Sequence, residues 1–274
     1  MTGHPSSLTT SLVGKVALVT GGAIRVGRAI CQALAGRGAS IAFTHLPGEP
    51  AEEAAAEIAA ELARSETGQR RVPETGQSRA PEIGQSGIVA LPMDVREPGA
   101  PQRVVEQVIG RFGRLDILVN NASVWLRAPF LEITAEAWQT ALDINLTGPF
   151  LMSQAAAPHM LKQGSGLIVS ITDLSAYQTW KEYAHHAATK AGLVALTRVM
   201  AAELAPAVRV NAIAPGTVLL PDGATDAKRQ WAESNSLLKR VGRPEDVART
   251  VLFLVDSDFA TGAVYFVDGG RALV

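Results

Sequence analysis

The stretch "VTGGAIRVGRAI", residues 19–30, decides the fold. It follows the apolar run "KVALVT" (15–20), which predicts a buried strand, and it opens a helix that we expect over 25–36. Between a strand and a helix, backbone N–H groups and the helix N-terminus bind pyrophosphate. Gly21 permits the tight turn, and Gly27 lets the helix pack close to the strand. The stretch therefore predicts a dinucleotide-binding loop.

Arg25 takes the place of the middle glycine of this loop. We expect its guanidinium to point toward a phosphate or the anionic edge of a substrate, because a planar fork of donors suits such groups. The alternative is a surface arginine that merely tolerates the turn.

Apolar runs that predict strands alternate with helical segments along most of the chain. The sequence therefore predicts an α/β fold, a single-domain Rossmann-like doubly wound parallel sheet of about seven strands with helices on both faces. Ligands of such sheets bind beyond the carboxyl ends of the strands. The expected strands are 15–20, 40–45, 87–93, 115–120, 166–171, 208–214 and 263–268.

One segment departs from this alternation. Residues 66–86 repeat "ETGQRRVP", "ETGQSRAP" and "EIGQS", and they contain almost no large apolar side chains. Such a composition buries too little surface to offset the entropy lost on ordering. We expect a flexible insertion within the domain 1–274, either a tolerated surface expansion or a binding arm.

Composition excludes several classes of function. The net charge of −1 does not suggest a nucleic-acid partner, and no apolar run reaches the roughly 18 residues of a membrane span. Cys31 is the only cysteine, which excludes an internal disulfide and favours a reducing compartment. The N-terminus lacks the pattern of a signal peptide. We expect a cytoplasmic protein that acts on a small molecule.

The motifs together resemble the short-chain dehydrogenase/reductase family over nearly the whole chain. They are the glycine loop from Thr20 to Gly27, "NNAS" at 120–123, "DINLTGPF" at 143–150, "RVNAIAPGTV" at 209–218 and "VDGG" at 267–270. Arginine in the loop combined with "NNAS" is similar to the pteridine reductase branch. That resemblance implies hydride transfer from a nicotinamide cofactor to a carbonyl or imine.

The strand expected at 40–45 ends in "FTHLPGE" and carries no acidic residue at its tip. A carboxylate there selects NADH through the ribose 2′-hydroxyl, and its absence favours NADPH. Thr44 and His45 are expected to bind the 2′-phosphate. Asp94 is expected beside the adenine, or as a helix cap, or in both roles. The residues expected to hold the cofactor are Gly21, Arg25, Val26, Gly27, Thr44, His45, Asp94, Val95, Asn121, Ala122, Ser123, Lys190, Pro215, Gly216, Thr217 and Val218.

The resemblance also implies a catalytic group of Asn145, Asp173, His186 and Lys190. Asn145 and Lys190 match the family pattern, whereas Asp173 stands at the usual serine position and His186 at the usual tyrosine position. His186 and Lys190 are four residues apart on one helix, so both face the cleft. Tyr183 lies about 10 Å along the axis from Lys190 and is expected to line the substrate pocket rather than donate the proton.

Three interpretations of His186 remain open. It donates the proton with Asp173 as its partner, or Asp173 or water protonates the substrate, or activity is weak or absent while cofactor binding persists. The adjacent pair His185–His186 predicts no metal site, because neighbouring side chains diverge on a helix. By the resemblance, the helix expected over 182–204 forms a dimer face, which implies a homotetramer or homodimer.

Overall fold

A seven-stranded parallel sheet forms the centre of the molecule, in the order β3-β2-β1-β4-β5-β6-β7. The computed structural model describes residues 10–48, 51–69, 87–221 and 223–274, and only the backbone of 65–69. The strands are β1 (Val16–Val19), β2 (Ser40–His45), β3 (Ile88–Pro92), β4 (Ile117–Asn120), β5 (Gly166–Ile171), β6 (Val208–Pro215) and β7 (Val264–Val267). The predicted doubly wound α/β sheet is confirmed.

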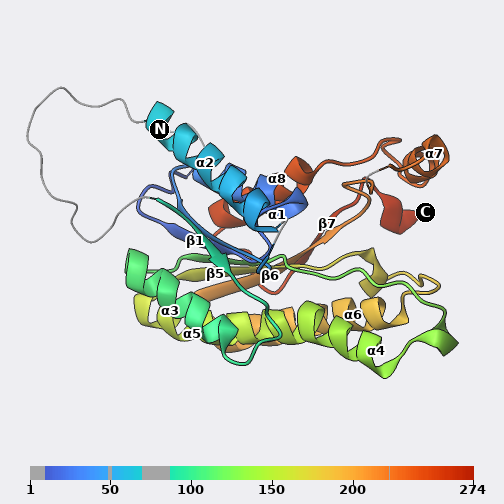
Figure 1. The fold of residues 1–274 in the computed structure, drawn as a ribbon, viewed down its shortest axis with the longest axis horizontal. Coiled ribbons are helices and arrows are strands. Elements are labelled where there is room, and N and C mark those ends of the chain that lie inside the picture. The colour runs from blue at the N-terminus through green and yellow to red at the C-terminus, as the bar shows by residue number, and fades with distance from the viewer. Residues whose placement is uncertain (1–9, 49–50, 70–86, 222) are drawn as a thin grey trace, which may run out of the picture.

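Helices cover both faces of this sheet. Figure 1 shows α1, α2 and α8 on one side, with α3, α5 and α6 on the other. The helices are α1 (Arg25–Ala35), α2 (Ala51–Gln69), α3 (Ala100–Phe112), α4 (Ala135–Leu142), α5 (Gly148–Gln163), α6 (Ala184–Leu204), α7 (Asp226–Ser234) and α8 (Pro244–Asp256).

The strands are apolar throughout because both of their faces are buried. In β1, Ala17 and Val19 join the hydrophobic core under α1 and α8, while Val16 and Leu18 join the core on the opposite face. This alternation follows from the two-residue period of a strand. One sheet therefore separates two cores.

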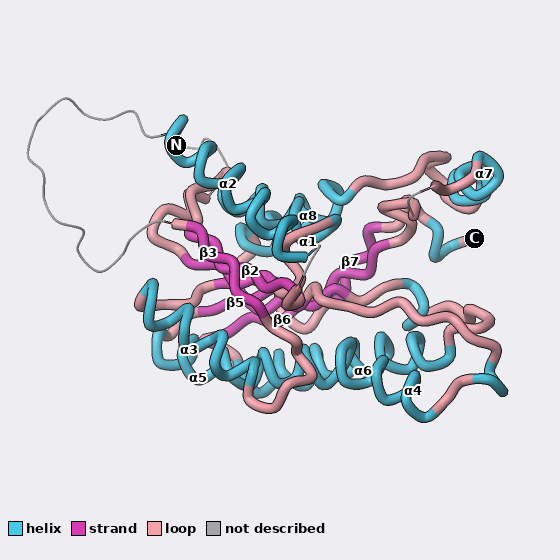
Figure 2. The backbone as a smooth tube through the Cα atoms, viewed as in Figure 1, coloured by secondary structure: helices cyan, strands magenta, loops and turns pink. Residues whose placement is uncertain are grey.

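The carboxyl ends of four neighbouring strands supply the predicted site. Because β1, β4, β5 and β6 are adjacent and parallel, the segments that follow them lie along one edge of the sheet. Figure 2 shows this β-strand core with the loops that extend from it. The glycine loop, "NNAS", Asp173 and "PGTV" are thereby gathered from distant parts of the sequence.

Two expected segments have different boundaries. Helix α2 continues to Gln69, so residues 66–69 of the repeat stretch are helical, and 70–86 lie outside the described residues. The helix expected over 182–204 begins at Ala184, with Tyr183 as its N-cap. Asn145 lies in the π-helical turn η2 (Asp143–Thr147) between α4 and α5. Such turns often occur at functional sites.

Candidate active site

The glycine loop between β1 and α1 has the geometry of an anion cradle. Gly21 adopts a left-handed φ of 63°, and a Cβ on Gly27 would lie 2.2 Å from the Gly21 carbonyl oxygen. Helix α1 begins at Arg25 after Ile24, which gives no side-chain cap to the first N–H groups. Those N–H groups and the positive end of the helix dipole suit a pyrophosphate. The loop therefore fits a dinucleotide cofactor.

Arg25 itself adopts a left-handed φ of 52°, which is uncommon for a residue other than glycine. Its side chain is exposed at the start of α1, beside Val26. The Arg25 guanidinium is thus accessible to solvent at the start of the helix.

Three side chains brace the loop from below. The Asn121 amide donates to the carbonyl oxygens of Thr20 at 3.0 Å and Gly21 at 3.1 Å. Thr20 Oγ1 accepts from the backbone N–H groups of Asn121 and Ala122. Thr44 Oγ1 accepts from the Gly21 N–H at 3.1 Å, and Thr44 is buried. The structure therefore places Thr44 under the loop, where it fixes the turn.

His45 lies at the end of β2 and is largely buried. Its Nδ1 lies 2.8 Å from the Leu46 carbonyl oxygen, so Nδ1 carries a proton and donates it. The opposite nitrogen, Nε2, is therefore free of this proton and is a hydrogen-bond acceptor.

Asp94 follows β3 and is held by Arg96. Two guanidinium nitrogens of Arg96 lie 2.6–3.1 Å from the Asp94 carboxylate, and these hydrogen bonds lower the pKa of Asp94. Asp94 does not cap the next helix, because α3 begins at Ala100 with Gly99 as its N-cap. Its carboxylate instead accepts from the Arg96 backbone N–H in a local turn. Val95 packs over Gly148 at the start of α5.

The predicted catalytic residues do come together. Asp173 follows β5, His186 and Lys190 lie on α6, and Asn145 comes from η2. His186 Nε2 is 2.6 Å from Asp173 Oδ2, and Lys190 Nζ donates to the Ile171 carbonyl oxygen at 3.0 Å. Only 1% of His186 and 4% of Lys190 is exposed. The site is therefore a buried group of titratable side chains.

Hydrogen bonds fix the orientation of the Asn145 amide. Its Oδ1 accepts from the Val124 backbone N–H at 2.8 Å and from Ser123 Oγ at 2.9 Å. Its Nδ2 donates to the Val124 carbonyl oxygen and lies 3.4 Å from His186 Nδ1. Because Nδ2 can only donate, Nδ1 of His186 is the acceptor, and the ring proton resides on Nε2. That proton is donated to Asp173.

Burial and neighbouring charges shift the pKa values of Asp173 and Lys190. Burial acts to raise the pKa of Asp173, but the hydrogen bond from His186 and the charge of Lys190 lower it below its ordinary value. Burial lowers the pKa of Lys190, and the Asp173 charge acts in the opposite sense. Asp173 is therefore an ionised acceptor, supported by Ser175, whose N–H and Oγ donate to its Oδ1.

Aromatic rings surround His186. The Trp125 ring centroid lies 4.4 Å from the His186 ring and 5.1 Å from Tyr183. Trp180 lies 5.6 Å from Trp125. Tyr183 belongs to this wall, with its ring 6.4 Å from His186. These rings pack against the imidazole and give this part of the site an apolar side.

The "PGTV" segment at 215–218 leads to a residue that sequence reasoning missed. Thr217 Oγ1 accepts a 2.8 Å hydrogen bond from Nη1 of Arg271. Gly216 lies so close to Asp268 that a Cβ on it would be 2.8 Å from that residue's backbone. Val218 is buried. Arg271 lies three residues before Val274, and only its place after "VDGG" connects it with the site.

His185 is buried beside the site, with neither ring nitrogen hydrogen-bonded among the described residues. Burial lowers the pKa of His185, so its ring is neutral in the fold. In the part of the chain that the structure covers, no group of three or more His, Cys, Asp or Glu side chains is placed to hold a metal ion.

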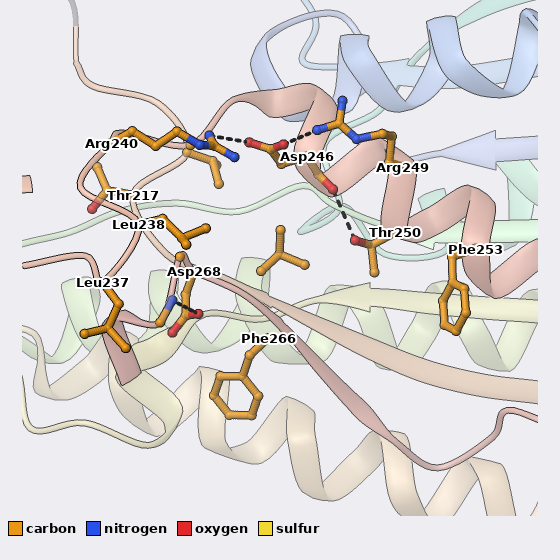
Figure 3. Close-up of a pocket in the computed structure, with 15 residues that line it drawn as sticks. Thr217, Leu237, Leu238, Arg240, Asp246, Arg249, Thr250, Phe253, Phe266 and Asp268 are labelled. Carbon is orange, nitrogen blue, oxygen red and sulfur yellow. Dashed lines mark hydrogen bonds and ion pairs between the residues drawn. The ribbon is translucent and has the colours of Figure 1, made fainter. Parts of the chain in front are cut away.

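A cavity of about 560 Å³ lies apart from these catalytic residues. Figure 3 shows Phe253 of α8 and Phe266 of β7 facing it, with Leu237 and Leu238 from the loop after α7. Asp246 pairs there with Arg240 and Arg249. One carboxylate is thus shared by two guanidinium groups. Among the described helices, none is long and apolar enough to cross a membrane.

Comparison with known proteins identifies relatives that share this architecture. Residues 60–272 match the family described as "Enoyl-(Acyl carrier protein) reductase". The chain is 35% identical to L-rhamnose-1-dehydrogenase of Scheffersomyces stipitis, covering 96% of this chain and 98% of that protein. It is 32% identical to a 3-oxoacyl-[acyl-carrier-protein] reductase of Thermotoga maritima, covering 96% and 99%. A mutant short-chain dehydrogenase/reductase of Serratia marcescens superposes with a TM-score of 0.82 at 31% identity, covering 96% and 100%.

Proposed function

The chain belongs to the short-chain dehydrogenase/reductase family, and we propose that it is an NADPH-dependent reductase in which the His186–Asp173 pair handles the proton. Hydride transfer to or from a small molecule is the chemistry of the family. The observation that carries the proposal is the 2.6 Å contact between His186 Nε2 and the ionised Asp173. Lys190 and Asn145 flank this pair on the same side of the sheet.

Asp173 supports proton donation by His186. An ionised carboxylate at hydrogen-bond distance stabilises positive charge on an imidazole. The Asn145 amide acts against this charge, because an N–H on His186 Nδ1 would face the Nδ2 donor at 3.4 Å. Protonation of His186 therefore requires this contact to open, and it is the longer of the two contacts that the ring makes. The substrate heteroatom then receives its proton from the imidazole.

NADPH is the proposed cofactor, and when bound it supplies the hydride. Arg25, Val26 and the loop glycines would hold its pyrophosphate. His45 and Arg25 would bind the 2′-phosphate, since the end of β2 carries no carboxylate. Lys190 has N–H groups beyond the one donated to Ile171 and would bind the nicotinamide ribose. Comparable efficiency with NADH and NADPH would contradict this preference.

The proposed substrate is a carbonyl or imine compound, and a pteridine is the candidate that the Arg25 and Asp173 positions favour. The decisive assay follows NADPH oxidation with dihydropterins, quinonoid pterins, quinones, ketones and 3-oxoacyl thioesters. A parallel series tests NADP⁺ reduction with sugars and polyols. Each is run on the wild type, on His186→Ala, and on His159→Ala, a matched control on α5. Loss of turnover in His186→Ala alone supports a catalytic histidine.

A second candidate is a cofactor-binding protein with little or no turnover. The observation that favours it is the burial of His186, whose two nitrogens both have protein partners and whose face is covered by Trp125. Tight NADPH binding by the wild type without turnover, together with activity in His186→Tyr, would establish this candidate and refute the catalytic histidine.

We also propose a cytoplasmic homodimer or homotetramer that associates through α6. The exposed and half-exposed positions of this helix include small residues such as Ala187, Ala188 and Ala191, which permit close approach of another helix. Light scattering at micromolar concentration tests this proposal, and a monomer would contradict it.

A further inference from the structure

The short C-terminal turn is held against the candidate site. Left-handed Gly269 and Gly270 turn the chain after β7, and the turn η4 (Arg271–Leu273) follows. The Arg271 carbonyl oxygen accepts from Gln178 Nε2 at 3.2 Å. Gln178 lies in the loop that begins with Asp173, so the turn and the catalytic loop are joined directly. The Arg271 backbone is therefore tied through its carbonyl oxygen to the loop that begins with Asp173.

The Arg271 guanidinium contacts two tryptophan rings. Its central carbon is 5.2 Å from the Trp180 ring centroid and 4.8 Å from that of Trp231 on α7. Nη1 donates to Thr217 Oγ1 at 2.8 Å. These contacts fix the plane of the guanidinium and offset part of its lost hydration. Figure 1 shows α7 and the C-terminus at the same end of the molecule, as these contacts require.

The Arg271 charge has no direct counter-ion in the described part of the chain. Within the described residues, no carboxylate oxygen forms an ion pair with it at 4.0 Å or less. Asp268, the nearest in sequence, accepts instead from the N–H groups of Gly270 and Ala272. Burial lowers the pKa of Arg271, while Asp268 and Asp173 act in the opposite sense. The guanidinium remains charged, with N–H donors beyond the one given to Thr217.

Arg271 and His186 share one aromatic wall. Trp180 contacts the guanidinium on one side and Trp125 on the other, and Trp125 in turn covers the His186 ring. A ligand lying on Trp125 and Trp180 would thus extend from the proposed proton donor to the arginine. An anionic group at one end would give the Arg271 guanidinium the counter-ion that it lacks among the described residues.

We infer that Arg271 binds a carboxylate of the substrate, whose flat or apolar body lies on Trp125 and Trp180. The substrate class is a carbonyl or imine compound that carries a carboxylate. A carboxylate matches the fork of guanidinium N–H groups and forms stronger hydrogen bonds than a neutral group does. The inference rests on the proposed reductase function for the position of the reacting carbonyl, but anion binding is measurable without turnover.

The test compares acids with their amides by calorimetry on the NADP⁺-saturated full-length protein. The probes are benzoate and 2-naphthoate, each beside its carboxamide, which has the same shape without the charge. We expect the acids to bind the wild type about ten-fold more tightly than the amides. Equal affinities, or no binding of either acid at millimolar concentration, would overturn the inference.

Variants assign the effect to Arg271. In Arg271→Met the preference for the acid is lost, and in Arg271→Lys part of it remains because the charge persists without the fork. Arg229→Met, at an exposed arginine of α7, is the matched control and keeps the full preference. If Arg271→Met does not fold, the comparison of acid and amide on the wild type and on Arg271→Lys still tests whether Arg271 binds the carboxylate.

The NADPH dissociation constant, followed by fluorescence, separates the substrate from the cofactor as the source of the anion. We expect it to be unchanged in Arg271→Met. A rise of ten-fold or more with an unchanged ratio of acid to amide would assign the guanidinium to a cofactor phosphate and overturn the inference. A preference for acids in a protein without turnover would leave the anion site standing and contradict the reductase. Turnover without a preference for acids would support the reductase and contradict the anion site.

Discussion

Two aspartates are buried at opposite ends of the parallel strands, and they have different partners. We call these two sides of the sheet its amino edge and its carboxyl edge. Asp116 precedes β4 at the amino edge, where its carboxylate accepts from Arg114, from Lys15 at 3.1 Å and from the Val16 backbone N–H at 3.0 Å. Asp173 follows β5 at the carboxyl edge and accepts from His186 and Ser175. Both are less than a tenth exposed.

Burial acts to raise the pKa of each carboxyl, and in each case the partners reverse that effect and lower it. The direction of the shift therefore does not distinguish the two sites. The partners do, because Asp116 pairs with a guanidinium and an ammonium, which only donate hydrogen bonds, whereas Asp173 pairs with an imidazole, a group that can both donate and accept. The amino edge has a fixed charge network, and the carboxyl edge can take part in proton transfer.

The largest expected effect is that of Asp173→Asn. The amide keeps the shape of the side chain but removes the charge that stabilises a protonated His186, so we expect kcat to fall about 10²- to 10⁴-fold. Steady-state NADPH oxidation measures it. Asp116→Asn is the matched control at the other edge and keeps kcat within about two-fold of the wild type, which is close to the resolution of such comparisons. Equal losses in both variants would remove the distinction between the two edges.

Asp116→Ala tests the amino edge through stability. The change leaves the Val16 N–H without its acceptor and removes two ion pairs, whose cations are partly exposed. We expect a loss of about 2 kcal/mol in the free energy of unfolding, mostly from the buried N–H. Urea unfolding with an unchanged m-value measures it. Asp173→Asn should lose less, and the opposite ranking would show that the catalytic edge carries the stabilising charge.

Some features of the carboxyl edge could be predicted from the sequence, and others could not. The strands and the glycine loop were predictable because they depend on local pattern, whereas the grouping of Asn145, Asp173, His186 and Lys190 was expected from the family resemblance. The proton on Nε2 of His186 was not, since it follows from the orientation of the Asn145 amide, which Val124 fixes. Such hydrogen bonds join segments that are not close in sequence.

Arg271 was missed for a related reason. Its partners Thr217, Trp180 and Trp231 lie 54, 91 and 40 residues away in sequence, on three different segments. No local spacing indicates that contact. The expectation that Asp94 caps a helix was wrong, because helix α3 begins several residues later, at Ala100. Features that depend on local backbone geometry could thus be predicted from the sequence. Side-chain contacts between distant loops could not.

Acid sensitivity gives a smaller and more specific test of the amino edge. The folded pKa of Asp116 is lowered, so its contribution to stability is present above the unfolded pKa of about 3.9 and is lost as pH falls through the folded value. The difference in unfolding free energy between the wild type and Asp116→Asn should be constant above about pH 5 and shrink below about pH 4. Urea unfolding across this range measures it. A difference that grows on acidification would contradict the lowered pKa.

Ser175→Ala is the mildest change and acts on the carboxyl edge alone. Ser175 Oγ donates to Asp173 Oδ1 at 2.5 Å, and this hydrogen bond helps to lower the pKa of Asp173. Its removal should raise that pKa and cost about 1 kcal/mol, while the Ser175 backbone N–H still donates to the carboxylate.

The pH dependence of kcat separates this electrostatic effect from a general loss of packing. With a raised Asp173 pKa, the acidic limb of the pH–rate profile should move to higher pH in Ser175→Ala, while kcat on the plateau falls only a few-fold. Ser153→Ala, at a buried serine of α5 that binds Asn120, is the matched control and should leave the limb in place. A shift in both variants would mean that the acidic limb reflects unfolding of the protein rather than protonation of Asp173. The carboxyl edge would then have no role in proton transfer that the amino edge lacks.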